Sequence, residues 1–184
     1  MVKNKKNQLL KMSNSYLIIL LASTLLLCTQ CKKGKNIDAD GLPKATRIGA
    51  MVFACKINGQ NWIASYKNYN ISGAIKGDTI SFRGTVAETI ETFQILILKK
   101  NDQMTYKLSD SNNQYAQYIS DKDCSNSKLI NGWSEKKATE GELTFTTIDK
   151  ERKVISGTFW FNVPTDKCGL LKITDGRFDI RYNN

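Results

Sequence analysis

The sequence alternates between apolar and polar residues from about residue 50 almost to its C-terminus. Every second side chain from Met51 to Ile57 is apolar, which places these side chains on one face of an extended strand. Asn58-Gly59 follows directly, and both residues tolerate positive φ. The pattern therefore predicts a tight hairpin that joins this strand to a second one over residues 60–64.

The same alternation predicts more strands in the middle of the chain. They span residues 69–74, 79–86, 93–99, 105–108 and 115–119. Turns are expected at Gly77-Asp78 and Asn101-Asp102, because these residue types favour turn conformations. Only residues 86–92 fit a turn of helix, so no long helix is expected.

The C-terminal third carries the clearest strand signal. Residues 142–147 and 155–163 alternate on either side of the charged loop 149–153. This arrangement predicts a long antiparallel hairpin with one aromatic face. Pro164 is expected to end the second strand of the hairpin.

The last segment is expected to add a strand at 170–174, to bend at Asp175-Gly176 and to finish with an amphipathic strand. In that final strand the side chains expected to face inward are Phe178, Ile180 and Tyr182, and those expected to face outward are Arg177, Asp179 and Arg181. About ten short strands with evenly spaced turns predict an all-β fold. We expect a single antiparallel β-barrel or β-sandwich, with a lipocalin-like barrel among the alternatives.

The first thirty residues differ from the rest of the chain. They contain four lysines, at positions 3, 5, 6 and 11, and no acid, and an apolar run spans residues 16–27. A basic stretch before a short apolar run is typical of a secretory signal peptide. An uncleaved membrane anchor is the less favoured alternative, because about twenty apolar residues are needed to span a bilayer. Removing four lysines and no acid would lower the formal net charge from +10 to +6.

Two cysteines near the end of the apolar run, Cys28 and Cys31, bear on where the signal is cleaved. In bacterial lipoproteins the first mature residue is a lipid-modified cysteine that follows small or modestly polar residues. Cys28 follows three leucines, whereas Cys31 follows Thr29-Gln30, so Cys31 is the predicted lipidation site. Free secretion without lipid is the alternative. The predicted organisation is a signal peptide at 1–30, a lipidated N-terminus and flexible tether at 31–49, and an antiparallel β domain at 50–184.

The absence of histidine excludes several kinds of catalytic and metal site. The 184 residues include no histidine, so neither a Ser-His-Asp or Cys-His machinery nor an imidazole metal site can form. We therefore expect a protein that is not an enzyme and that holds no cofactor and no metal. Nucleic acid is not expected as a partner, because the protein is exported and its remaining charge is scattered. Asp38 and Asp40 lack the further ligands of a calcium loop and are interpreted as part of the solvated tether.

Three cysteines lie in the predicted domain. Cys55 shares a strand face with apolar residues and is interpreted as a buried small hydrophobe. Cys124 and Cys168 lie in polar surroundings and are the candidates for a disulfide in an oxidising compartment. Three widely spaced cysteines supply too few ligands for a zinc site.

Trp62, Trp133 and Trp160 are the candidate contacts for a ligand or a partner, because indole rings stack on sugars and line apolar cavities. Packing in the core or a groove is the favoured role for tryptophans of this kind. Trp160 stands between Phe159 and Phe161 and falls on the opposite face of their strand. We therefore expect Trp160 to be exposed.

Three segments carry a resemblance to a known family. They are residues 53–62 with the pattern FxCxINGxxW, residues 155–161 with ISGTFxF, and residues 173–182 with ITDGRFDIRY. In these motifs the chain resembles a family of small Bacteroidota lipoproteins of unknown function. The resemblance implies an exported, lipid-anchored β domain without an established activity, substrate or catalytic residue.

The residues after Cys31 bear on location. Surface-exposed Bacteroidota lipoproteins often carry acids there, whereas this chain has Lys32, Lys33 and Lys35. We expect a protein anchored by lipid in the outer membrane, on the periplasmic face rather than the cell surface. The expected function is a binding module for a small apolar molecule, a glycan or an envelope protein. The alternative is a structural or accessory lipoprotein that acts only through protein contacts.

Overall fold

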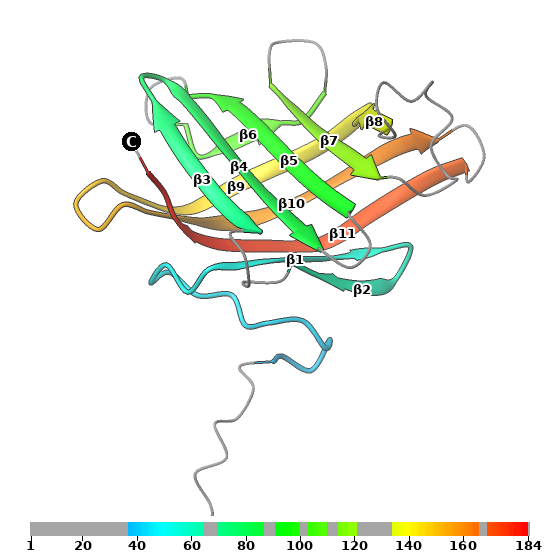
Figure 1. The fold of residues 1–184 in the computed structure, drawn as a ribbon, viewed down its shortest axis with the longest axis horizontal. Helices are drawn as coiled ribbons and strands as arrows, with labels where there is room; N and C mark the ends of the chain where they lie inside the picture. The colour runs from blue at the N-terminus through cyan, green and yellow to red at the C-terminus, as the bar shows by residue number, and fades with distance from the viewer. Residues whose placement is uncertain are drawn as a thin grey trace, which may run out of the picture. The chain divides into compact units, whose positions relative to one another are not determined.

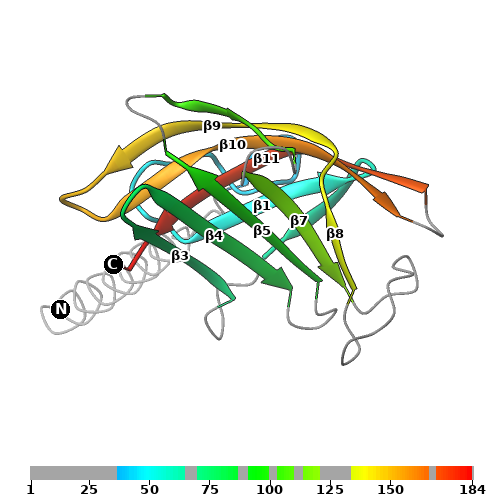
Figure 2. The same cartoon turned by 90° about the horizontal axis from the view of Figure 1, so that it is seen from above.

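The computed structural model describes residues 37–64, 70–86, 91–99, 103–109, 114–120, 134–165 and 169–183. These residues form two antiparallel β-sheets that face each other (Figures 1 and 2). The six-stranded sheet consists, in spatial order, of β2 (Gln60–Ile63), β1 (Val52–Ile57), β11 (Gly169–Arg181), β10 (Val154–Thr165), β9 (Glu140–Asp149) and β6 (Thr105–Lys107). The five-stranded sheet consists of β3 (Ile71–Lys76), β4 (Thr79–Val86), β5 (Glu91–Leu98), β7 (Tyr115–Ser120) and β8 (Ser134–Lys137).

The all-β prediction is confirmed, and the architecture is the sandwich rather than the barrel. Over the described residues the two sheets remain separate ladders and do not close. At one edge β3 meets Asn183 through an isolated bridge at Ala74, with backbone hydrogen bonds of 3.0 Å to the Gly73 carbonyl and 3.4 Å from the Ile75 N–H. At another place the chain passes from β8 to β9, where the Thr139 N–H donates a hydrogen bond to the Asn162 carbonyl at 3.0 Å. These hydrogen bonds join the two sheets locally but do not extend into a continuous strand ladder.

The predicted turns follow from residues that accept positive φ. Asn58 and Gly59 have φ of 50° and 84° and connect β1 to β2, as the sequence predicts. Gly77 has φ of 57° in the turn between β3 and β4. The predicted strands at 79–86 and 115–119 agree with β4 and β7 to within one residue. The Asn101-Asp102 turn lies outside the described residues.

Aromatic rings from both sheets fill the space between the layers. Phe53 of β1 lies 6.1 Å from Phe82 of the facing sheet and 5.1 Å from Phe159 of its own, measured between ring centroids. Gly84 makes this packing possible, because a Cβ at that position would lie 2.6 Å from the Phe53 ring. The other rings of this core are Trp62, Phe93, Tyr106, Tyr118, Phe145, Phe161, Phe178 and Tyr182. The apolar face of each predicted strand is thus buried against the other sheet.

The C-terminal hairpin is longer than the sequence predicts. Pro164 does not end β10 but pairs with Leu170 of β11. The ladder between β10 and β9 stops at Asn162, so Pro164 has a neighbouring strand on one side only. A proline is tolerated at such an edge, because its missing N–H leaves no partner unsatisfied.

β11 is one continuous strand, whereas the sequence analysis expected two strands separated by a bend. Phe159 pairs with Gly176 and Phe161 with Ile173, so β11 holds an extra residue at this point. This β-bulge shifts the alternation by one, and for that reason Ile173 and Phe178 both face the core although they are five positions apart.

Two further segments differ from the expectation. β8 (Ser134–Lys137) was not predicted, because its residues show no apolar alternation. Residues 91 and 92, expected in a turn of helix, begin β5, and residues 87–90 lie outside the described part of the chain. The predicted burial of Cys55 is confirmed.

Residues 37–50, here named the strap, lie on the outer face of the six-stranded sheet, away from the core (Figure 1). The sequence analysis placed 37–49 in a flexible tether, but Leu42 is fully buried and Ile37 bridges Pro43. Asp179 does face away from the core as expected, yet it is only 1% exposed because the strap covers it. The predicted signal peptide and residues 31–36 lie outside the described residues. Within the described part, no helix is long and apolar enough to cross a membrane.

Candidate functional site

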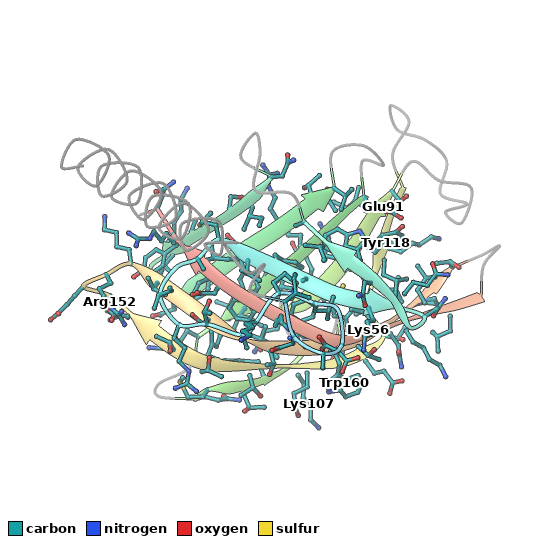
Figure 3. All side chains as sticks on the ribbon, turned by 90° about the horizontal axis from the view of Figure 1, so that it is seen from below. Lys56, Glu91, Lys107, Tyr118, Arg152 and Trp160 are labelled. Carbon is teal, nitrogen blue, oxygen red and sulfur yellow. The ribbon has the colours of Figure 1, made fainter. Side chains whose placement is uncertain are left out.

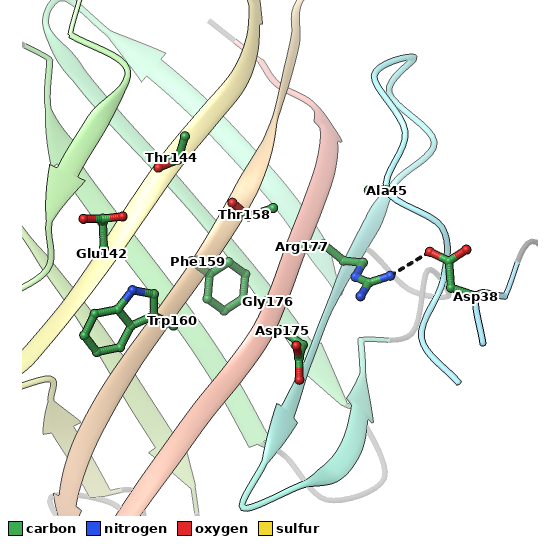
Figure 4. A pocket seen from close by; sticks show the side chains of 10 residues that line it. All are labelled: Asp38, Ala45, Glu142, Thr144, Thr158, Phe159, Trp160, Asp175, Gly176 and Arg177. Atoms are coloured by element: carbon green, nitrogen blue, oxygen red, sulfur yellow. Dashed lines mark hydrogen bonds and ion pairs between the residues drawn. The ribbon is translucent and has the colours of Figure 1, made fainter. Parts of the chain in front are cut away.

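The outer face of the six-stranded sheet contains an open hollow of about 430 Å³ (Figure 4). β9, β10 and β11 form its floor, and the strap forms one wall. The lining residues are Asp38, Ala45, Glu142, Thr144, Thr158, Phe159, Trp160, Asp175, Gly176 and Arg177.

Trp160 is the large aromatic side chain of this hollow. It stands on β10 between Phe159 and Phe161, whose side chains point into the core. The strand alternation therefore turns the Trp160 indole outward, and 43% of the residue is exposed. The predicted exposure of Trp160 is confirmed. In Figure 3 Trp160 and Lys107 lie on one side of the sandwich, away from Glu91 and Tyr118 of the other sheet.

Two carboxylates line the hollow together with Trp160, one from each neighbouring strand. Glu142 of β9 is the register partner of Trp160. On the other side the β-bulge of β11 places Asp175 in the lining of the hollow. Asp175 forms an ion pair with Lys56 of β1 at 3.2 Å. A bulge commonly re-aims one side chain of a strand, and here it adds a carboxylate to the lining of the hollow.

Hydroxyl groups form the next row across the sheet. Thr144 and Thr158 are register partners on β9 and β10. The Thr144 hydroxyl also lies 3.1 Å from the hydroxyl of Thr105 on β6. The hollow therefore offers hydrogen-bonding oxygens beside an apolar plane.

Arg177 of β11 holds the strap wall in place. Its guanidinium donates to Asp38 Oδ2 at 3.0 Å, to the Pro43 carbonyl at 3.1 Å and to Asp40 Oδ2. The hydrogen bond from the Leu42 N–H, together with Arg177, holds the pKa of Asp40 below its usual value despite the opposing effect of burial. Asp38 and Asp40, expected in a solvated tether, are thus parts of an ordered ion-pair cluster.

The other predicted contact residues do not join this hollow. Trp62 is 6% exposed and packs in the core, with its ring centroid 4.7 Å from that of Phe93. Trp62 thus has the structural packing role. Trp133, the lipidation candidate Cys31 and the disulfide candidates Cys124 and Cys168 lie outside the described residues. No group of three metal-ligating side chains is found in the described part of the chain.

The sequence predicts that Trp160 is exposed, but it does not predict the carboxylates that line the hollow with it. The sequence places residue 142 at the start of a predicted strand, and Asp175 in a predicted bend. The sequence signal for the bulge is the pair Asp175-Gly176 inside an otherwise regular strand pattern. Such a pair is typical of a bulge as well as of a turn. The strap wall carried no signal, since its contacts join residues more than 130 positions apart.

These features define a class of protein: an antiparallel β-sandwich whose outer sheet face presents an exposed tryptophan in a polar hollow. Residues 50–179 match the family described as a domain of unknown function, DUF6252, and the chain belongs to this family. The expected membership in a family of unknown function is thereby confirmed. No curated protein and no solved structure matches the chain.

Proposed function

We propose that this protein is a lipid-anchored envelope protein that binds a glycan in the hollow around Trp160. The observation that carries the proposal is the exposed indole in a hollow that Glu142, Asp175 and threonine hydroxyls also line. The face of a sugar ring carries C–H groups that stack on an aromatic plane, and its rim carries hydroxyls that bond to carboxylates and hydroxyls. The lining of the hollow matches both parts.

The packing between the sheets supports a polar ligand over an enclosed apolar one. A lipocalin-like carrier needs a hollow interior, whereas here rings contact each other where such a ligand would lie, for example Phe53 with Phe159 and Phe93 with Phe161. Binding outside the sandwich leaves this core undisturbed.

We propose binding rather than catalysis. Asp175 is paired with Lys56, and Asp38 with Arg177, so neither carboxylate stands ready as a free acid or base. Glu142 alone supplies too little for the acid–base pair that glycoside cleavage uses.

The anchoring part of the proposal rests on the sequence. A lipid-modified Cys31 would hold the protein in the outer membrane, on the periplasmic face, and the resemblance to Bacteroidota lipoproteins points the same way. Intact-mass and peptide mass spectrometry of protein purified from its own membranes would detect acyl groups on Cys31. The same digest would detect the Cys124–Cys168 disulfide. An unmodified Cys31 in mature protein would contradict the anchor.

Glycan binding is tested with the purified protein on an array of neutral, acidic and amino-sugar oligosaccharides, followed by titration calorimetry with the best binder. Trp160→Ala should weaken binding at least tenfold, because stacking on the indole is lost. Leu170→Ala is the matched control, since Leu170 is also on the six-stranded sheet and 45% exposed but does not line the hollow. Equal affinity of wild type and Trp160→Ala would exclude this hollow as the binding site.

The second candidate function is that of an accessory lipoprotein that binds another envelope protein. The same exposed indole favours it, because tryptophan is enriched at the energetic centres of protein interfaces. Failure of every oligosaccharide, together with a Trp160-dependent crosslink to one envelope protein, would favour this candidate.

A further inference from the structure

The strap is pinned to the sheet by a buried carboxylate. Asp179 Oδ1 accepts hydrogen bonds from the Gly49 N–H at 2.8 Å and the Ser156 hydroxyl at 2.7 Å. Its Oδ2 accepts from the Ala50 N–H at 3.0 Å, the Ile48 N–H at 3.1 Å and the Thr46 hydroxyl. Four of these five donors belong to the strap. The backbone of residues 46–50 therefore has a fixed position on the outer face.

Arg177 pins the other end of the strap through Asp38, Asp40 and the Pro43 carbonyl. Arg177 pairs with both acids of the strap, and its single positive charge balances one of their two negative charges. Lys44 and Arg47, in contrast, are exposed, and no ion pair to either is found within the described residues. The exposed part of the strap therefore carries two cations, Lys44 and Arg47.

The strap also exposes large apolar side chains, which is unusual for a segment that is otherwise well packed. Ile48 is 61% exposed and Ile37 is 38% exposed, while Leu42 between them is fully buried. The Arg181 side chain, also exposed, reaches toward the Gly49 and Ile48 carbonyls at 3.4 and 3.5 Å and adds a third cation. Isoleucines beside lysine and arginine form the combination that enters the interface of an anionic bilayer.

The length of the chain ahead of the strap brings this surface close to a membrane. Six peptide steps lead from Cys31 to Ile37, a span of at most about 20 Å when fully extended. Lys32, Lys33 and Lys35 fall within the same span and carry the same sign of charge. A lipid on Cys31 therefore leaves the strap within reach of the head groups.

We infer that the outward side of the strap is a membrane-docking surface, on which Ile48, Lys44 and Arg47 contact anionic phospholipid head groups. The inference uses the proposed lipid on Cys31 only to bring the strap close to the bilayer. Docking by the strap adds a second, electrostatic attachment to the acyl chains and fixes which side of the sandwich faces the lipid.

The test removes the acyl chains, so that docking is measured separately from anchoring. The protein is produced from residue 31 onward with Cys31→Ser, which keeps every described residue of the strap and the sandwich. Sedimentation with vesicles of phosphatidylcholine containing about one-third phosphatidylglycerol should show weak binding that disappears at high salt and on pure phosphatidylcholine.

Charge reversal identifies the surface. Lys44→Glu with Arg47→Glu should weaken vesicle binding by more than about 25-fold, because each basic contact is worth roughly fivefold and each glutamate is also repelled. Ile48→Ser should weaken it by about fivefold and keeps the backbone bond to Asp179. Lys107→Glu with Lys150→Glu is the control, since both lysines are exposed on other parts of the same sheet and its loops.

Three results would overturn the inference: equal binding to neutral and anionic vesicles, no binding to either, or loss with the control pair equal to loss with Lys44→Glu and Arg47→Glu. Near-ultraviolet circular dichroism of each variant verifies that the sandwich is intact. Glycan titration of the same protein reports on the hollow separately, so failure of docking and failure of glycan binding are distinguishable.

Discussion

Gly49 and Asp179 are 130 positions apart in the sequence, and the Gly49 N–H donates a hydrogen bond of 2.8 Å to the Asp179 carboxylate. Gly49 has φ of +74°, a conformation that glycine adopts without strain. This backbone shape directs the N–H groups of residues 48–50 toward one carboxylate, much as a backbone nest holds an anion. The carboxylate thus joins the strap to the centre of the sheet.

Replacing Asp179 should release the strap and destabilise the domain. Asp179→Ala leaves five buried or half-buried donors without an acceptor, and we expect a loss of about 3 kcal/mol in the free energy of unfolding. Urea denaturation measures this loss. Asp175→Asn is the control, because the Asp175 side chain is 48% exposed and its replacement should cost under about 0.5 kcal/mol.

Trypsin supplies a local measurement of the same release. Its cleavage sites Lys44 and Arg47 lie within the strap, and a pinned backbone resists entry into a protease active site. Asp179→Asn should therefore speed cleavage after these two residues under conditions in which the sandwich stays folded. Unchanged cleavage rates would show that Asp179 does not hold the strap.

Asp179 should also make stability depend on pH at the acidic end. Burial alone would raise the pKa of Asp179, but the hydrogen bonds from Thr46, Ala50, Ser156 and Gly49 outweigh it and hold the pKa below its usual value. A carboxyl with a lower pKa in the folded than in the unfolded protein stabilises the fold fully above its unfolded value. That contribution is lost as the pH falls through the folded value.

Unfolding measured between pH 7 and pH 2 checks this dependence. The difference in unfolding free energy between wild type and Asp179→Asn should be constant above about pH 5 and should shrink below about pH 4. A difference that grows on acidification would contradict the assignment of these hydrogen bonds to the charged form.

The strands were predictable because their signal is local. The alternation around Phe53 or Phe159 reports which side of a strand is buried, and Asn58-Gly59 reports a turn, without reference to the rest of the chain. The bulge at Asp175 was not predictable in the same way, because it exists only relative to the register of β10. The burial of Asp179 likewise depends on a segment that is remote in sequence and polar enough to be taken for a tether.

In the candidate site, too, the local feature was predictable and the non-local features were not. The outward direction of Trp160 follows from its position between two core phenylalanines, so the sequence predicted it. Its two carboxylate neighbours come from other strands, Glu142 by cross-strand register and Asp175 by the bulge. Alternation in one strand carries no information about either neighbour.

Gly84 should tolerate no side chain while Phe53 occupies its present position. A Cβ on Gly84 would lie 2.6 to 2.9 Å from three atoms of the Phe53 side chain, closer than packed atoms can approach. Gly84→Ala should therefore destabilise the domain by about 1–3 kcal/mol. Phe53→Leu removes part of the ring, so the double variant should lose less stability than the sum of the two single losses. A double-mutant cycle by urea denaturation measures this coupling, and strict additivity would show that the two residues do not meet.

Cys55 should be chemically inert in the folded protein. The residue is fully buried beside Trp62, its register partner on β2. Burial, with a smaller contribution from the charge of Glu91, raises the pKa of the Cys55 thiol far above its ordinary value. The thiolate is the reactive form, so both access and ionisation oppose alkylation. Iodoacetamide labelling followed by peptide mass spectrometry should leave Cys55 unmodified in native protein and label it fully in urea. Rapid labelling without denaturant would mean that β1 and β2 open locally, because the thiol has no path to solvent while that hairpin covers the core.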